Sequence, residues 1–411
     1  MSPSRIAPDA STTGRPSPYR FFADYRTLMC VPGFWRMATI GMTSKLGASM
    51  TGLSLLLLVS SSSSYGTAGL AVSCSTLGQG LTAPLRGRLI DRHPARPVLL
   101  SCLAAQLAAT IAVITAVRRG ADATLICTLS AAVGASAPPV AVMMRSVWHS
   151  VTTRTTLNTA MALDASMMGA ALIVGPVLAG WLSLSLSPIL PFAAITTMTV
   201  TTVVLVTGRS SNVHAPPART GHWLGPLASP LLRRLLASDA LFVTGVTAVD
   251  VVLPIYARQE QATELTGLYL GSLAVGSFVG SFALGTTTQR LRRRLTLPVL
   301  LGLFALGCAA LAGAARLSPM AVLMVCPVAG LVIGSVFALL RTTGGDLAPA
   351  GQVTETMSWL STLDMAGGAA GAAVFAHLAD AKGSPTALVL VPVLVATAAV
   401  AGRRLQTRQG R

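Results

Sequence analysis

The feature that most constrains this chain is a succession of apolar segments about twenty residues long, separated by short polar stretches. A helix rises about 1.5 Å per residue, so about twenty residues cross the roughly 30 Å hydrocarbon core of a bilayer. The 411 residues are 52% hydrophobic and only 10% charged, which leaves too few ionisable groups to cover a soluble globule. The sequence therefore predicts an all-α integral membrane protein.

The apolar segments fall into two groups of six, which predicts twelve transmembrane helices. The first group is 38–60, 66–86, 97–117, 123–147, 158–185 and 188–207. The second group is 239–257, 265–288, 296–315, 319–341, 356–379 and 386–402. Between the groups lies a polar, proline-bearing stretch in which residues 231–236 are expected to form a short interfacial helix.

These segments predict five parts. They are a tail (1–34), a first six-helix bundle (35–207), a linker (208–236), a second six-helix bundle (237–402) and a C-terminal tail (403–411).

The distribution of basic residues predicts the orientation in the membrane. The net charge is +17, but the Lys and Arg residues stand in small groups at the edges of apolar segments, so no nucleic-acid surface is expected. Twenty-four of them fall on the side of the N-terminus, five fall on the opposite side, and Lys45 lies inside the first segment. Because basic loops stay in the cytoplasm, we expect a multi-pass protein of a bacterial plasma membrane with both termini cytoplasmic. No cleaved signal peptide is expected.

Motifs for metal binding and catalysis are missing from the sequence. The six cysteines have no C-x-x-C spacing and lie mostly inside apolar segments, so neither a disulfide framework nor a zinc site is indicated. There is no His cluster, Ser/His/Asp spacing or carboxylate-rich metal motif within the helices. We therefore expect a protein that is not an enzyme and has no metal or cofactor.

An internal repeat relates the two groups of helices. Three pairs of short motifs recur at one offset of 198 to 200 residues: Gly87-x-x-x-Asp91-Arg92 with Gly285-x-x-x-Gln289-Arg290, Val133-Gly134 with Ile333-Gly334, and Leu163-Asp164 with Leu363-Asp364. Transporters built from two six-helix halves have such repeats, related by an axis along the membrane normal.

Taken together, residues 35–403 resemble the major facilitator superfamily (MFS), specifically its twelve-helix bacterial, actinobacterial-like exporters of drugs and metabolites. The loop that begins at Gly87 is similar to the family's loop 2-3 signature, G-x-x-x-D-R-x-G-R-R, with Pro94 in place of a glycine. The resemblance implies two pseudo-symmetric six-helix bundles. It also implies a cytoplasmic gate that docks near residues 354–357 and is formed by Gly87, Asp91, Arg92 and Arg96.

The residue types of this loop suit a gate. Gly87 permits a close turn, and the carboxylate of Asp91 is favourable at the N-terminus of a neighbouring helix. Arg92 and Arg96 can pair with acids or anionic headgroups. The alternative is that these charges only set the membrane topology.

A second motif lies in the fifth apolar segment. Gly175-Pro176-Val-Leu-Ala-Gly180 resembles the G-P-x-x-G-G element of exporters that work as antiporters. The alternative is that the small residues only allow close helix packing and a bend. The family's fourth-helix arginine is replaced by Ser130, so its proton-coupling role does not carry over, and Arg145 is expected to face the loop.

Ionisable residues inside the apolar segments are candidate functional groups, because a charge at mid-bilayer costs about 3 kcal/mol or more. Four remain after loop charges are removed: Lys45, Asp164, Asp250 and Asp364. The three acids are each expected to carry a proton, to bind a cationic substrate, or to hold helices together by hydrogen bonds. Lys45 is expected either to snorkel to the cytoplasmic interface or to line the central cavity, as partner to an acid or as an attraction for anionic substrates.

The function that follows is secondary active transport, with proton-coupled efflux of a small amphiphilic compound, such as an antibiotic or secondary metabolite, as the leading hypothesis. The expected partners are the small-molecule substrate, protons and the lipid bilayer, with the proton gradient as energy source and the monomer as functional unit. The alternatives are proton-symport uptake of a small metabolite, and a membrane sensor or scaffold that has kept the fold without transport.

Overall fold

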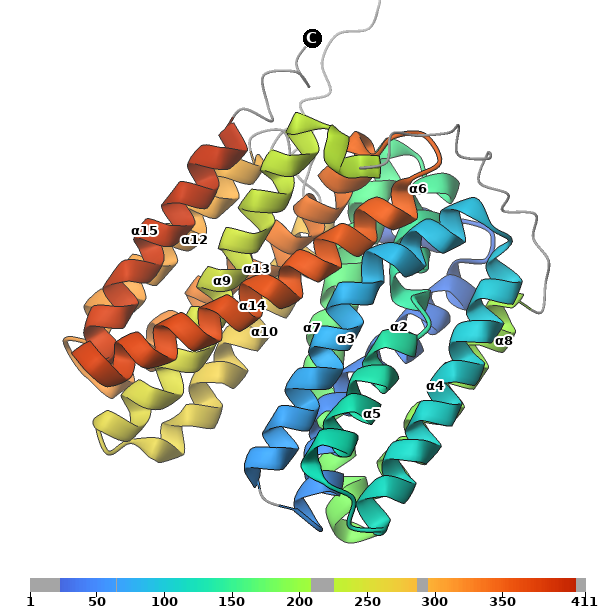
Figure 1. The fold of residues 1–411 in the computed structure, drawn as a ribbon. Coiled ribbons are helices and arrows are strands. Elements are labelled where there is room, and N and C mark those ends of the chain that lie inside the picture. The colour runs from blue at the N-terminus through green and yellow to red at the C-terminus, as the bar shows by residue number, and fades with distance from the viewer. Residues whose placement is uncertain (1–22, 64, 208–224, 287–294, 404–411) are drawn as a thin grey trace, which may run out of the picture.

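The computed structural model describes residues 23–63, 65–207, 225–286 and 295–403 (Figure 1). The expected tails, much of the linker, and the Gln289-Arg290 pair of the repeat lie outside the described residues.

The described chain is built of helices arranged as two bundles side by side (Figure 1). The first bundle contains α2 (Phe34–Ser60), α3 (Tyr65–Arg92), α4 (Ala95–Arg118), α5 (Ala123–Ser136), α6 (Val140–Val151), α7 (Arg154–Ser185) and α8 (Leu190–Thr207). The second contains α9 (Pro230–Gln259), α10 (Thr266–Thr286), α12 (Leu297–Ala314), α13 (Pro319–Leu347), α14 (Val353–Lys382) and α15 (Ser384–Arg403). Three short elements complete it: α1 (Ala23–Met29), η2 (Gly225–Ala228) and η3 (Thr263–Leu265). With α5 and α6 taken as one interrupted span, the fold predicted from the sequence is confirmed: two six-helix bundles.

Two of the twelve spans are more polar than the rest. Within the described residues, ten spans are long and apolar enough to cross a membrane by composition, and α3 and α14 are the two that are not. α3 is the second span of the first bundle and α14 is the fifth span of the second, and the two helices pack against each other between the bundles (Figure 1). Several of their polar residues are covered by protein rather than by lipid, among them Arg86, Thr354 and Glu355.

The fourth span is broken, so the prediction of one uninterrupted helix over 123–147 was wrong. Pro138 and Pro139 lack N–H groups, and the helix ends at Ser136 and restarts at Val140. The carbonyl groups freed by the break find donors on α3. Thr82 Oγ1 donates to the Ala135 oxygen at 3.1 Å, and Arg86 donates to the oxygen of Ala137.

The expected short interfacial helix over 231–236 is instead the beginning of α9. Ser229 caps this helix, accepting a hydrogen bond from the Leu232 N–H, and Pro230 occupies the first turn, where a missing N–H costs nothing. Leu232 and Leu235 are fully buried in the core of the second bundle. Packing of this apolar face extends the helix beyond the membrane-spanning part.

The two bundles contact each other near one face of the molecule. We call the face at which α2 begins and α15 ends the terminal face, and the opposite one the far face. Between α3 and α14, Thr362 Oγ1 donates to the Gly80 oxygen at 2.7 Å, and between α7 and α10 the hydroxyls of Ser166 and Ser281 are 2.8 Å apart. All four residues lie on the terminal-face halves of their helices.

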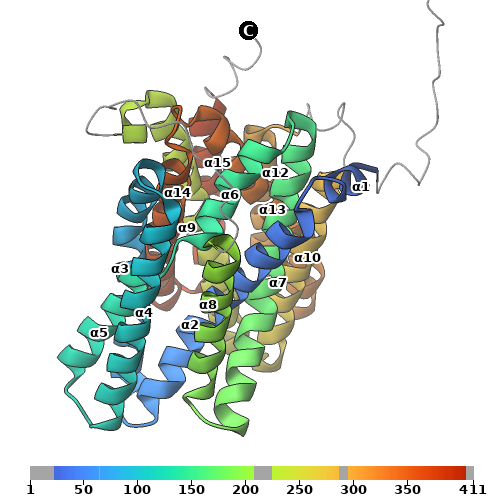
Figure 2. The same cartoon turned by 90° about the vertical axis from the view of Figure 1, so that its right-hand side faces the viewer.

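The short helix α1 adds a further contact between the bundles at the terminal face. It precedes the first bundle in the chain but lies against α7 and α10 (Figure 2). The ring of Tyr25 stacks on Phe282 of α10 with centroids 4.7 Å apart, and its hydroxyl donates to the Phe282 oxygen at 3.2 Å.

Candidate functional site: two charge clusters and a gate

The first charge cluster joins Lys45 of α2, Arg145 of α6 and Asp164 of α7. Lys45 Nζ lies 2.5 Å from Asp164 Oδ1, and Arg145 Nε lies 3.0 Å from Asp164 Oδ2. Lys45 is 1% exposed and Asp164 is 4% exposed, so the pairs are shielded from water and lipid. Arg145 also reaches the second bundle, where its Nη1 lies 3.5 Å from Ser361 Oγ on α14.

The second charge cluster joins Asp239 of α9, Arg341 of α13 and Asp364 of α14. Arg341 Nη2 pairs with Asp364 Oδ2, and its Nη1 lies 3.5 Å from Asp239 Oδ2. The latter contact is within ion-pair distance but is not aligned as a hydrogen bond, and Nη1 has no acceptor. Asp239 is fully buried, whereas Asp364 is 27% exposed.

The two clusters are related by the internal repeat. Arg341 follows Arg145 by 196 residues, and Asp364 follows Asp164 by 200. The third members, Lys45 and Asp239, lie on the first helix of each bundle and carry opposite charges. The first cluster therefore has two cations and one acid, and the second has two acids and one cation.

Three of the four intramembrane candidates predicted from the sequence belong to these clusters. Asp164 and Asp364 occupy equivalent positions. Lys45 does not snorkel to the interface, because it is buried as the partner of an acid. The expectation that Arg145 faces the loop was wrong, since its guanidinium turns inward to Asp164.

Sequence reasoning missed Asp239 and Arg341. Asp239 is the first residue of the predicted segment 239–257 and Arg341 is the last residue of 319–341, so the sequence places both charges at the membrane interface. The internal repeat could have identified Arg341, because Arg341 follows Arg145 by 196 residues, close to the repeat offset of 198 to 200.

Asp250 stands apart from both clusters. Its side chain is exposed on α9, while its neighbours Val249, Val252 and Leu253 are buried in the core of the second bundle. Among the described contacts none gives Asp250 an ion pair or hydrogen bond. An exposed carboxylate within a membrane span is more stable facing water than facing lipid.

The loop residues that the sequence predicts to form a gate lie at the terminal face. Asp91 Oδ2 accepts a hydrogen bond of 2.8 Å from the Glu355 N–H, in the first turn of α14. That N–H has no acceptor within its own helix, so Asp91 caps α14 from the other bundle. Gly87 permits the approach, because a Cβ there would overlap the side chain of Ser358. The docking point expected at residues 354–357 is the one observed.

The ion pair of the gate is made by a different arginine from those expected. Arg88 Nη2 lies 2.6 Å from Glu355 Oε1, and Arg88 Nε lies 3.0 Å from the same oxygen. Arg92 and Arg96 are exposed at the terminal face. The sequence signature identified the loop that contacts α14. It did not identify Arg88 and Glu355, because their pairing depends on which helix packs against the loop.

Burial raises the pKa of Asp91 to about 6. Asp91 lies beyond the apolar part of α3, outside the membrane-spanning segment. Removal of water from the carboxylate is the largest cause, and hydrogen bonds from residues 354 and 355 offset part of it. The charge of Asp91 therefore changes in a mildly acidic range.

The Gly175–Gly180 motif lies on α7 against α2. A Cβ at Gly175 would overlap Ser49, whose hydroxyl donates to the Ala171 oxygen at 2.8 Å. At Gly180 the nearest atom to an added Cβ would be Leu53 Cδ2 at 3.8 Å, an ordinary contact. Helix α7 continues through Pro176 without interruption. Close helix packing at Gly175 is thus evident.

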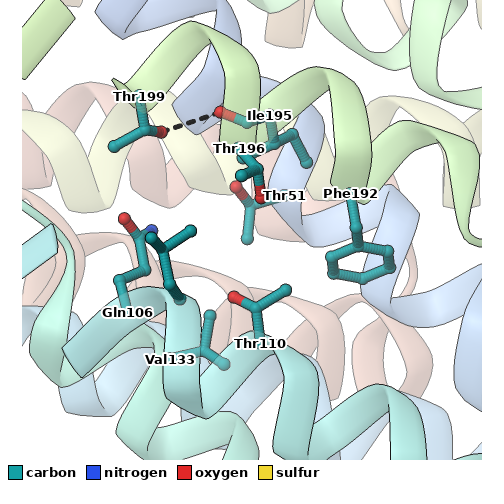
Figure 3. Close-up of a pocket in the computed structure, with 9 residues that line it drawn as sticks. Thr51, Gln106, Thr110, Val133, Phe192, Ile195, Thr196 and Thr199 are labelled. Atoms are coloured by element: carbon teal, nitrogen blue, oxygen red, sulfur yellow. Dashed lines mark hydrogen bonds between the residues drawn. The ribbon is translucent and has the colours of Figure 1, made fainter. Parts of the chain in front are cut away.

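A narrow pocket, partly open to the surroundings, lies within the first bundle (Figure 3). Its polar lining consists of Thr51, Gln106, Thr110, Thr196 and Thr199, and Figure 3 shows these side chains around one gap between α2, α4 and α8. No member of either charge cluster lines it.

The comparison with known proteins covers both helix bundles. Residues 37–402 match the family model described as Major Facilitator Superfamily. No curated protein sequence matched the chain.

Solved transporter structures share the fold at low sequence identity. The human organic anion transporter MFSD10 (TETRAN) aligns with a TM-score of 0.73 and 16% identity, covering 92% of this chain and 99% of that one. A bacterial homologue of the iron transporter ferroportin in an outward-facing state gives 0.74 and 18%, covering 90% and 98%. The transporter FucP in an outward conformation gives 0.72 and 17%, covering 90% and 98%.

Proposed function

The chain belongs to the major facilitator superfamily, a family of membrane transporters, and we propose that it exports a small amphiphilic compound in exchange for protons. Antibiotics and other secondary metabolites are the substrate class we favour. The observation that carries the proposal is the burial of carboxylates from both bundles beside the surface where the bundles meet. Such groups are costly in a membrane and are retained where charge or protons move.

Proton coupling is favoured by the charge balance of the clusters. In the second cluster two acids share one guanidinium, so binding a proton neutralises the site. Asp250, exposed on the same bundle, adds an acid that can bind a proton or a cationic substrate. Asp164, in contrast, is held by two cations. Among the three acids predicted from the sequence, Asp364 therefore becomes the leading coupling residue.

The direction of transport is inferred from the motif at Gly175, which resembles that of antiporters, and from the conformation. The bundles meet at the terminal face, which we propose is cytoplasmic, so this state is closed to the cytoplasm. In an exporter this state releases substrate and takes up protons from outside. Release from the monomer into the periplasm or medium is the step that the conformation represents.

The test of export is compound accumulation in a pump-deficient bacterial host. Cells expressing the protein should accumulate less of at least one amphiphilic compound and show a higher minimum inhibitory concentration, and a protonophore should abolish both effects. No change across a broad panel of compounds would reject export.

The same expression system tests the acids one by one. Asp364→Asn should abolish gradient-driven transport in vesicles with an imposed pH gradient, and Asp164→Asn and Asp250→Asn are tested alongside it. Full gradient-driven transport in all three variants would reject proton coupling through them.

Uptake by symport is the second candidate, because the fold is shared with a structure described as a fucose:proton symporter. At 16% identity that likeness concerns the fold alone. Symport predicts that the protein raises, rather than lowers, cellular accumulation of its substrate. A scaffold without transport predicts that all three Asp→Asn variants have no phenotype.

A further inference from the structure

The second charge cluster holds two acids against one guanidinium in a buried site. Asp239 is 0% exposed and Arg341 is 4% exposed. If all three groups were ionised, the cluster would carry one uncompensated negative charge. An unpaired charge in such a place costs several kcal/mol, about 3–5 when one partner of a buried pair is removed.

The hydrogen bonds of the cluster are incomplete in a specific way. Both oxygens of Asp239 and Oδ1 of Asp364 are buried and have no donor. The two carboxyl groups are nevertheless held beside each other, because Asp239 lies at Nη1 and Asp364 at Nη2 of the same Arg341 guanidinium. Two carboxylates are both acceptors, so they can hydrogen-bond to each other only when one of them carries a hydrogen. A hydrogen bond between the two carboxyl groups therefore requires one hydrogen atom on one of their oxygens.

We propose that the second charge cluster binds one proton, held as an O–H group on Asp239 that donates to Asp364. A hydronium ion gives up its proton to a carboxylate oxygen and leaves as water, and no other bond changes. Asp364 stays anionic and keeps its pair with Arg341, so the cluster becomes neutral. This deepens the proposed function by naming the proton site, and it rests on that function only for the claim that the proton is transported.

The two acids differ in exposure, and this difference gives them different roles in proton transfer. Asp364 is 27% exposed and is the member of the pair that water can reach. Asp239 is fully buried, so a proton reaches it by way of Asp364. Movement of α14 relative to α9 or α13 would change the access of water to Asp364 and the pairing of Asp364 with Arg341. Proton binding would thereby be coupled to the conformational change.

The first charge cluster provides the contrast. Both oxygens of Asp164 already have donors, Lys45 Nζ and Arg145 Nε. Two cations there compensate one acid, and no hydrogen is missing. The asymmetry between otherwise equivalent clusters assigns the proton to the second one.

Charged groups near the second cluster come from the facing bundle and from α13, which carries Asp346 five residues after Arg341. Arg145 of α6 contacts Ser361, one turn before Asp364 on α14. The ring of His149, also on α6, lies against Gly345, one turn after Arg341 on α13. Asp164 and Lys45 stand behind Arg145. His149→Gln is therefore included below, so that titration of the imidazole is separated from titration of the acids.

Infrared difference spectroscopy on the purified full-length protein, without substrate, tests the proton site. On acidification from about pH 8 to about pH 5, carboxylic acid C=O bands report each acid that binds a proton. Wild type should show one more such group than Asp239→Asn and one more than Asp364→Asn, because a single acid paired with Arg341 is already neutral. Asp164→Asn, His149→Gln and the surface variant Glu264→Gln should retain the group that these two lack.

The proposal is overturned if Asp239→Asn and Asp364→Asn, each shown to be monodisperse by size-exclusion chromatography, keep the wild-type carboxylic acid signal. If one variant fails to fold, the other decides. Displacement of the signal by Na⁺ at constant pH would also overturn it, in favour of a cation site. Because no substrate is present, a retained proton signal without gradient-driven transport would contradict the proposed function and leave the site standing.

Discussion

At the scale of single residues, Asp91 makes closure of the terminal face depend on pH. Its pKa is raised to about 6 in this closed state, whereas an Asp in water has a pKa of about 4. Opening the face returns the carboxylate to water and restores the lower pKa. Between about pH 6 and about pH 4 the closed state therefore holds a proton that the open state releases, so lowering the pH through this window favours closure.

Distances between spin labels on the terminal-face ends of α3 and α14 measure this effect. The closed fraction should rise as the pH falls through about 6 in wild type. Asp91→Asn keeps an acceptor for the Glu355 N–H but has no charge, so its closed fraction should vary less with pH in this window than that of wild type. Asp122→Asn, at an exposed helix cap on the far face, should behave as wild type. An unchanged pH dependence in Asp91→Asn would contradict the account.

Gly175 and Gly180 form a matched pair on α7 for testing close packing. Gly175→Ala forces the new methyl group onto Ser49, and overpacking of this kind costs about 1–3 kcal/mol. Gly180→Ala makes an ordinary contact with Leu53 and should be tolerated. Thermal unfolding in detergent should show a lower midpoint for Gly175→Ala alone. Equal midpoints would mean that α7 and α2 are not held together at Gly175.

The sequence identified some members of the charge clusters and not others for a physical reason. Asp164 and Asp364 stood deep within apolar segments, where any charge is conspicuous. Asp239 and Arg341 lay close to where the hydrophobicity begins to fall, and composition cannot distinguish a side chain that turns inward from one that faces the interface. Which groups pair depends on helix rotation, which is set by packing across the bundle.

At the scale of elements, the break between α5 and α6 depends on α3 as much as on its own prolines. Arg86 of α3 donates to the oxygens of Ala137 and Gln79, and it is buried to do so. Apolar periodicity predicted the span but not this break, because the prolines could have been accommodated by a kink. The donors that make a complete break possible are Thr82 and Arg86, which precede their acceptors by 53 and 51 residues in the chain.

Replacing Arg86 tests that dependence. Arg86→Met keeps much of the side-chain length but leaves buried carbonyl oxygens without a donor, which costs about 1–3 kcal/mol per group. The midpoint of thermal unfolding should fall relative to wild type and to Arg118→Met, which removes an exposed arginine at the end of α4. If Arg86→Met and Arg118→Met have the same midpoint of thermal unfolding, Arg86 does not stabilise the break.

At the scale of the whole molecule, the twelve spans and the two-bundle organisation were predicted from the sequence, because membrane-length apolar segments leave few alternatives. The conformational state could not be predicted from the sequence, because the sequence of a protein that alternates between two states is compatible with both. The contacts at Thr362–Gly80, Asp91–Glu355 and Ser166–Ser281 define a state in which the bundles meet at the terminal face.

The central claim is that export is driven by proton exchange through the second charge cluster. Its most direct test uses inside-out vesicles with an acidified lumen that contains a pH-sensitive dye. Adding a compound that the cell panel identifies as exported should release luminal protons from wild-type vesicles, and Asp239→Asn vesicles should release none. Entry of the compound into wild-type vesicles at the same rate after a protonophore has collapsed the gradient would contradict the claim.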